Sequence, residues 1–162
     1  MMEKPKIYLE TTMFSYYHEE RPQAEYQELK AQVRRIFDRI KAGEYEPYTS
    51  IFSTTEIDGE PDPEKREKMK ALIADYGITL LEVSPDAERL AVLYIQEGAV
   101  SPAWETDAAH IAMTTVNGLD FIVSLNFRHI ARPWTDERVR RVNVREGYQG
   151  IGIYKPAEVL EL

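Results

Sequence analysis

The sequence predicts one α/β domain over residues 1–162, built on a mainly parallel sheet of four to five strands. Short apolar segments typical of strands alternate along the chain with longer segments of helical spacing. The strand segments are continuously apolar, as in parallel strands that are covered on both faces. The sequence contains no internal repeat and no linker long enough to divide the chain, so we expect a single domain.

Five apolar segments predict the strands. A polar break, Glu10-Thr11-Thr12, follows the first segment. The fourth segment, Phe121-Ile122-Val123-Ser124-Leu125, is the most strand-like run in the chain. In chain order the predicted strands are residues 6–9, 48–52, 78–83, 121–125 and 141–144.

Five segments between the strands predict helices, and residues at their ends support the assignment. Residues 23–42 place apolar side chains on one face, and Gly43 follows as a C-cap. Ser53-Thr54-Thr55-Glu56 is typical of a capping box at the start of a helix. Pro85 after Ser84 is typical of a first helical position. The predicted helices are residues 23–42, a helix that begins at residues 53–56, and residues 64–76, 85–98 and 107–117.

The composition indicates a soluble globular protein. Hydrophobic residues make up 43% and charged residues 30% of the chain, which argues against disorder. The absence of cysteine excludes disulfides, thiolate catalysis and zinc fingers. The apolar run that begins at Ile7 is too short for a signal peptide or a membrane span. We therefore expect a cytoplasmic protein that does not bind membranes.

Four oxygen-bearing side chains stand just beyond the carboxyl ends of predicted strands, where open parallel sheets bind ligands. Glu10 directly follows the first strand, and Glu56 lies in the first turn of the helix after the second strand. Asp107 begins the helix before the fourth strand, and Asn126 directly follows that strand. Clustered carboxylates repel one another unless a cation is present, and Mg²⁺ prefers oxygen ligands. We predict that the three carboxylates converge on a metal ion that activates water for phosphodiester cleavage.

The charge of the chain is unevenly distributed. A net charge of −8 argues against a general nucleic-acid binder, because attraction to phosphate supplies most non-specific affinity. Between Arg128 and Arg145, however, six arginines accompany only two acidic residues, a local net charge of +4. This strip is either a solvated helix face or a surface for nucleic acid. Because Arg128, His129 and Arg132 come directly after the fourth strand, we expect them to flank the carboxylates and bind phosphate.

Four short motifs, in their order and spacing, resemble those of PIN domains, and most closely a branch of VapC-type toxins. No single motif is specific, so the resemblance depends on the ordered set of four. The likeness extends from about residue 6 to the end of the chain. The motifs are Ile7-Tyr8-Leu9-Glu10-Thr11-Thr12, Thr55-Glu56-Ile57, Asp107-Ala108-Ala109-His110-Ile111-Ala112 and Ser124-Leu125-Asn126-Phe127-Arg128-His129-Ile130.

The resemblance implies a three-layer α/β/α sandwich and an endoribonuclease that cleaves single-stranded RNA with Mg²⁺ or Mn²⁺. For toxin members it also implies a small antitoxin protein as partner and a homodimer. Carried over to this sequence, the acidic positions fall on Glu10, Glu56 and Asp107, with Asn126 at a fourth ligand position. The hydroxyl beside the first acid falls on Thr11, which is expected to bind RNA. Glu10 stands where aspartate is commoner, so its carboxylate is carried on a side chain that is longer by one methylene group. Asn126 replaces a fourth acid, which leaves one charge fewer for a second metal ion.

Each of these residues also has a purely structural alternative. Asp107 is favoured as a helix N-cap, and Glu56 as the acid of a capping box. Glu10 can pair with an arginine, and Asn126 is a common turn residue. His110 lies three residues after Asp107 on the predicted helix, where we expect it to pack and not to bind metal.

Other enzyme classes lack their motifs in this sequence. It has no Gly-x-Gly-x-x-Gly segment, no Walker loop and no Gly-x-Ser-x-Gly turn. Glu10-Thr11-Thr12 after the first strand disfavours an aspartyl-phosphate phosphatase, which uses Asp-x-Asp. The alternative to a nuclease is a PIN-like scaffold that binds RNA or a protein without cutting, because Asn126 weakens the acidic set.

Overall fold

The five strands form one parallel sheet. The computed structural model describes residues 3–162. The strand order is β3-β2-β1-β4-β5, and every neighbouring pair is parallel. This result confirms the predicted parallel sheet of four to five strands. The strands are β1 (Lys6–Leu9), β2 (Glu46–Ser50), β3 (Thr79–Leu81), β4 (Phe121–Val123) and β5 (Gly152–Tyr154).

Strand β1 lies at the centre of the sheet. Ile7 is in register with Pro47 of β2 on one side and with Phe121 of β4 on the other. Ile7, Tyr8 and Leu9 are all fully buried. The strand is continuously apolar because helices cover both of its faces.

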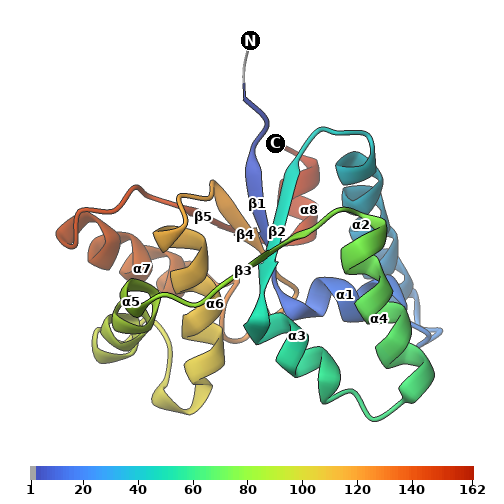
Figure 1. Cartoon of the computed structure of the whole chain (residues 1–162), viewed down its shortest axis with the longest axis horizontal. Helices are drawn as coiled ribbons and strands as arrows, with labels where there is room; N and C mark the ends of the chain where they lie inside the picture. The colour runs from blue at the N-terminus through green and yellow to red at the C-terminus, as the bar shows by residue number, and fades with distance from the viewer. Residues whose placement is uncertain (1–2) are drawn as a thin grey trace.

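Helices cover the two faces of the sheet in separate layers (Figure 1). The core on one face includes Leu9, Phe14 and Phe37, under α1, α2, α4 and α8. The core on the other face includes Tyr8 and Tyr94, under α5, α6 and α7. The fold is therefore the expected three-layer α/β/α sandwich. The helices are α1 (Thr11–Tyr17), α2 (Ala24–Lys41), α3 (Ile51–Asp58), α4 (Pro63–Asp75), α5 (Pro85–Gln96), the short 3₁₀ helix η1 (Pro102–Trp104), α6 (Glu105–Val116), α7 (Pro133–Arg145) and α8 (Pro156–Leu160).

Two helix ends form as the sequence predicts. Gly43 follows α2 with a φ of 82°, a left-handed conformation that glycine adopts without strain. Ser84 caps α5, because its hydroxyl accepts a hydrogen bond of 3.2 Å from the Ala87 amide, and Pro85 occupies the first position. No helix within residues 3–162 is long and apolar enough to span a membrane.

Several segments differ from the sequence-based prediction: strand β5 was not predicted, and residues 51–52 of the predicted second strand begin helix α3. The predicted strand at residues 141–144 is wrong, because these residues lie inside α7. Val139 and Val142 are buried three residues apart, whereas Val144 is 72% exposed, so helical packing overrides the β propensity of valine. The segment Glu10-Thr11-Thr12 is not only a polar break, since helix α1 begins at Thr11.

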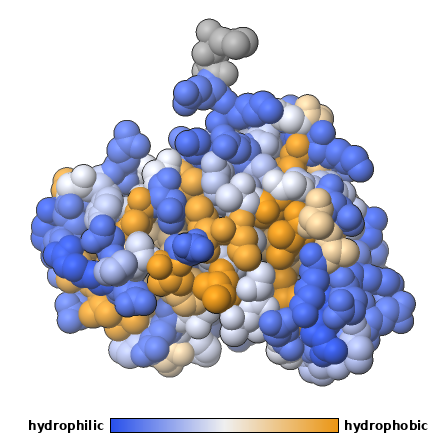
Figure 2. Space-filling view, in the orientation of Figure 1, coloured by the Kyte–Doolittle hydropathy of each residue, from blue (hydrophilic) through white to orange (hydrophobic). Residues whose placement is uncertain are grey.

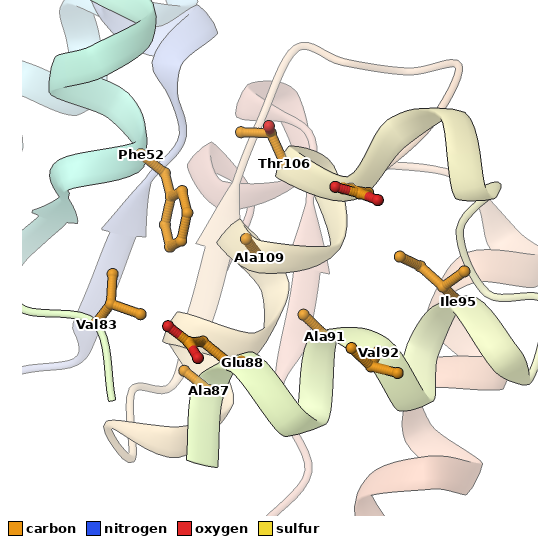
Figure 3. Close-up of a pocket in the computed structure, with 10 residues that line it drawn as sticks. Phe52, Val83, Ala87, Glu88, Ala91, Val92, Ile95, Thr106 and Ala109 are labelled. Atoms are coloured by element: carbon orange, nitrogen blue, oxygen red, sulfur yellow. The ribbon is translucent and has the colours of Figure 1, made fainter. Parts of the chain in front are cut away.

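An apolar groove of about 300 Å³ lies beside α5 and α6. Phe52, at the start of α3, lies opposite Ala91 and Ala109 of these helices (Figure 3). Figure 2 shows further apolar side chains gathered over the middle of the molecule in the orientation of Figure 1. None of the predicted site residues lines this groove, but Glu105 and Thr106 line both the groove and the pocket that contains Asp107.

Candidate metal centre and active site

Strands β1, β2 and β4 are adjacent and parallel, so their carboxyl ends meet at one edge of the sheet. Glu10 directly follows β1, and α3, which carries Glu56, directly follows β2. Asn126 lies three residues beyond the end of β4, and Asp107 lies in the first turn of α6. The topology therefore places all four predicted ligands at this edge.

Glu10 is buried and held by three donors. It is the N-cap of α1, and its Oε1 accepts a hydrogen bond of 3.2 Å from the Thr12 amide. The hydroxyls of Thr12 and Ser124 donate to the same oxygen, the latter at 2.6 Å. The arginine alternative is wrong, because no lysine or arginine within residues 3–162 forms an ion pair with Glu10. These contacts fix the orientation of the carboxylate without neutralising it.

Glu56 lies in the last turn of α3 and caps nothing. The helix begins at Ile51 with Ser50 as its N-cap, so the capping box predicted from Ser53 is wrong. Oε1 of Glu56 accepts hydrogen bonds from the Thr11 hydroxyl at 2.7 Å and from Nε2 of His110 at 2.6 Å. Burial raises the pKa of Glu56, but the bonds from His110 and Thr11 outweigh it and leave the pKa below its usual value. Glu56 is therefore ionised at neutral pH.

His110 is fully buried and orients Glu56, a role that the sequence analysis missed. Its Nδ1 lies 2.7 Å from the hydroxyl of Tyr8, which in turn lies 2.7 Å from the Ser50 hydroxyl. Burial raises the pKa of Tyr8 well above its usual range, so this phenol is neutral. The chain of contacts is satisfied if Ser50 donates to Tyr8, Tyr8 donates to Nδ1, and Nε2–H donates to Glu56. Both ring nitrogens are then engaged, so His110 positions a ligand.

Asp107 is the third residue of α6 and is not its N-cap, which is Trp104. The capping alternative is therefore wrong. Oδ1 of Asp107 accepts a hydrogen bond of 3.3 Å from the side-chain amide of Asn126, and Oδ2 lies 3.2 Å from Nδ1 of His129. Burial raises the pKa of Asp107, and the negative charge of Glu10 raises it further. Asp107 thus lies within electrostatic reach of Glu10.

Asn126 combines a turn with a contact to the cluster. Its Oδ1 accepts from the His129 amide at 3.1 Å, and its carbonyl accepts from the amides of Ile130 and Ala131. The backbone amide of Asn126 donates to the Ser124 hydroxyl at 2.9 Å. Because Ser124 also bonds Glu10, Asn126 links Glu10 to Asp107. The turn alternative is correct and compatible with a place beside the carboxylates.

The donor set fits a hard divalent cation. An oxygen of Glu10 lies within 4.8 Å of an oxygen of Glu56, and a ring nitrogen of His110, which orients Glu56, lies within the same distance of both; Asp107 is not part of this group. Asp107 and Asn126 line the same 440 Å³ pocket as Glu56. Within residues 3–162, no lysine or arginine forms an ion pair with Glu10, Glu56 or Asp107. Carboxylate oxygens are the ligands that Mg²⁺ and Mn²⁺ prefer, and the basic partners of Glu56 and Asp107 are histidines, His110 and His129.

The residues expected to bind RNA differ in their surroundings. Arg128 is exposed, and its guanidinium forms no hydrogen bond or ion pair within residues 3–162. Arg132 instead donates to the Thr135 hydroxyl and to the Arg128 carbonyl, both at 2.6 Å, so it braces the loop before α7. The Thr11 hydroxyl is bound to Glu56.

Helix α7 carries most of the arginine strip, and most of its charge is paired locally. Arg140 pairs with Asp136 at 3.1 Å, Arg141 pairs with Glu137, and Arg145 pairs with Glu97 at 2.7 Å. This pattern is that of a solvated helix face. Arg128 is therefore the member of the strip best placed to meet a phosphate.

The fold is similar to that of a known toxin. The solved structure of VapC20 from Mycobacterium tuberculosis, a sarcin–ricin loop cleaving toxin, superposes with a TM-score of 0.52. The similarity covers 72% of this chain and 86% of that one, at 14% sequence identity. This chain has a VapC-like PIN-domain fold. Comparison of the sequence with models of protein families finds no match, and comparison with curated proteins finds none either. The PIN resemblance of the four motifs thus agrees with the three-dimensional fold.

Proposed function

We propose that this chain is an endoribonuclease that cleaves single-stranded RNA and depends on Mg²⁺ or Mn²⁺. The observation that carries the proposal is the placement of Glu10, Glu56 and Asp107 at one sheet edge without a lysine or arginine partner in the described part of the chain. Such a cluster is costly unless a cation binds it. The similarity to VapC20, a toxin that cleaves the sarcin–ricin loop, supports the same type of activity.

In this proposal Glu10, Glu56, Asp107 and Asn126 hold the metal ion. When bound, the ion activates water and stabilises the charge that develops on the phosphate. The chain's own contribution is to keep the ligands in position before substrate arrives. Buried or partly buried hydroxyls and amides do so at Glu10, and His110 does so at Glu56.

The PIN resemblance further supports a place in a toxin–antitoxin pair. We propose that a small antitoxin protein binds this chain, that the chain forms a homodimer, and that it acts in the cytoplasm. The alternative is a non-catalytic PIN-like module that binds RNA or a protein. Asn126 favours that alternative, because it supplies no charge where the family has a fourth acid.

A cleavage assay separates the two functions. We expect the wild-type chain to cleave a labelled single-stranded RNA with Mn²⁺ or Mg²⁺, and to lose this activity when a chelator is added. Glu10→Gln is expected to lower the rate by about 100-fold or more, as removal of one preorganised charged group does elsewhere. Cleavage that persists in the chelator, or no cleavage with either ion over a wide range of substrates, contradicts a metal-dependent nuclease.

Arg128→Ala tests the contact with the RNA backbone. If the free guanidinium of Arg128 neutralises one phosphate, its loss should weaken RNA binding and reduce the slope of log affinity against log salt by about 0.7. Arg140→Ala is the matched control, since Arg140 is exposed but paired with Asp136. Equal slopes for wild type and Arg128→Ala, measured by fluorescence anisotropy, mean that Arg128 does not touch RNA.

A further inference from the structure

An exposed tryptophan lies beside the carboxylate cluster and has no part in the proposed metal site. Trp104 ends the short helix η1 and precedes α6, so it stands three residues before Asp107. Its side chain lines the same 440 Å³ pocket as Glu56, Asp107 and Asn126. Although large and aromatic, it is 44% exposed. Because this exposed aromatic ring lines the pocket, it is available to a ligand that binds there.

The indole is held in a fixed orientation from one side. Its ring stacks on His129, with centroids 3.9 Å apart and an angle of 21° between the planes. His129 is fixed in turn, because its Nδ1 lies 3.2 Å from Asp107 and its amide donates to Asn126. The Trp104 ring is thus only one side chain away from the predicted metal ligand Asp107. Within residues 3–162 its indole N–H makes no hydrogen bond.

We propose that Trp104 is a stacking platform for a nucleobase of single-stranded RNA. It would hold the base of a nucleotide whose backbone lies at the Asp107 edge of the carboxylate cluster. A flat, oriented and exposed ring suits a base, because every nucleobase offers a π-face of its own. The net charge of the chain is −8, which disfavours RNA binding through phosphate contacts alone, so stacking supplies affinity that charge does not. This inference rests on the proposed function and adds a substrate-positioning residue to it.

Two probes that differ only in their bases test the inference. Oligoadenylate and an abasic ribose-phosphate oligomer of equal length carry the same charge, and binding is measured at low salt with a chelator, so that no cleavage occurs. Trp104→Ala should weaken oligoadenylate binding by about 5- to 150-fold and leave the abasic oligomer unaffected. Trp104→Phe should keep much of the affinity, since phenylalanine also stacks. Trp134→Ala is the matched control, because Trp134 on α7 is similarly exposed, at 49%. This variant should bind both probes as the wild type does.

Fluorescence gives a second measurement that does not depend on an alanine variant. The sequence has two tryptophans, so Trp134→Phe leaves Trp104 as the sole indole. Oligoadenylate should quench its emission, and the abasic oligomer should not. Equal loss of both probes in Trp104→Ala means that Trp104 only supports His129 and Asp107. Unchanged affinity for oligoadenylate, or no quenching, likewise overturns the stacking role.

The same samples keep this inference distinct from the nuclease proposal. If the wild type cleaves no RNA with Mn²⁺ but Trp104→Ala still loses base-dependent binding, the nuclease proposal fails and the stacking role stands. If the wild type cleaves RNA and Trp104→Ala binds both probes as the wild type does, only the stacking role fails.

Discussion

Asp107→Asn is expected to leave the metal-free protein at least as stable as the wild type at pH 7, while abolishing both RNA cleavage and stabilisation by Mn²⁺. For the wild type, Mn²⁺ at a hundredfold excess over Kd should add about 2.7 kcal/mol of stability. In a domain of this size that corresponds to a rise in Tm of roughly 5–11 °C. The variant should show little or none of this rise, and its cleavage rate should fall by about 100-fold or more.

The surroundings of Asp107 explain why Asp107→Asn should not destabilise the metal-free protein. Burial and the charge of Glu10 both raise the pKa of Asp107 in the folded state. The folded protein then binds protons more tightly at this group than the unfolded chain does, so this group makes the protein less stable as pH rises above the unfolded pKa. Asparagine removes that cost and still offers an oxygen to the Asn126 amide, which donates at 3.3 Å in the wild type. The advantage of the variant should therefore be larger at pH 7 than at acidic pH.

Asp86→Asn is the control for loss of one negative charge. Asp86 is exposed in the first turn of α5, so its variant should keep both cleavage and the full Mn²⁺ effect. Thermal unfolding of the three proteins, with chelator and with excess Mn²⁺, supplies the comparison. Equal Mn²⁺ stabilisation of wild type and Asp107→Asn, with cleavage intact, would remove Asp107 from the metal site.

The parallel sheet could be predicted because its strands are continuously apolar and alternate with helices. Ile7, Tyr8 and Leu9 carry this signal, and burial on both faces explains it. The error at residues 141–144 has the opposite cause. Valine favours strands on average, but Val142 packs in the core as part of a helix that Pro133 begins, and no local pattern reports that tertiary contact.

The position of the site could be predicted from strand ends, but the contacts that orient its carboxylates could not. The capping alternatives for Glu56 and Asp107 are wrong because both helices begin earlier than the capping patterns indicate. His110 was expected only to pack. One signal was available: on a helix, residues three apart lie on the same face, so His110 shares the face of Asp107. Its bonds to Glu56 and Tyr8 depend on residues 54 and 102 positions away in the sequence, which only the fold brings together.

His110→Ala is expected to cause the largest loss of stability among the site variants. It removes a fully buried ring and leaves the Tyr8 hydroxyl without its partner in the core. A buried cavity and an unsatisfied polar group together cost about 3 kcal/mol, or roughly 6–12 °C in Tm. Glu56 also loses the bond that orients it, so Mn²⁺ affinity and cleavage should fall by about 10- to 100-fold. Both are measured at a temperature at which the variant is fully folded.

Tyr94→Phe separates orientation of Glu56 from loss of stability alone. The Tyr94 hydroxyl is buried and bonded to Thr115 at 2.9 Å and to Asn143 at 2.5 Å, with no contact to the carboxylates. Its removal should destabilise the core by about 1–3 kcal/mol and leave cleavage and Mn²⁺ affinity at wild-type values. Tyr8→Phe should destabilise the protein to a similar degree but also weaken Mn²⁺ binding, because Nδ1 of His110 loses the hydroxyl partner that fixes its ring. If His110→Ala and Tyr8→Phe keep wild-type cleavage while folded, His110 is a packing residue and Glu56 needs no partner to bind metal.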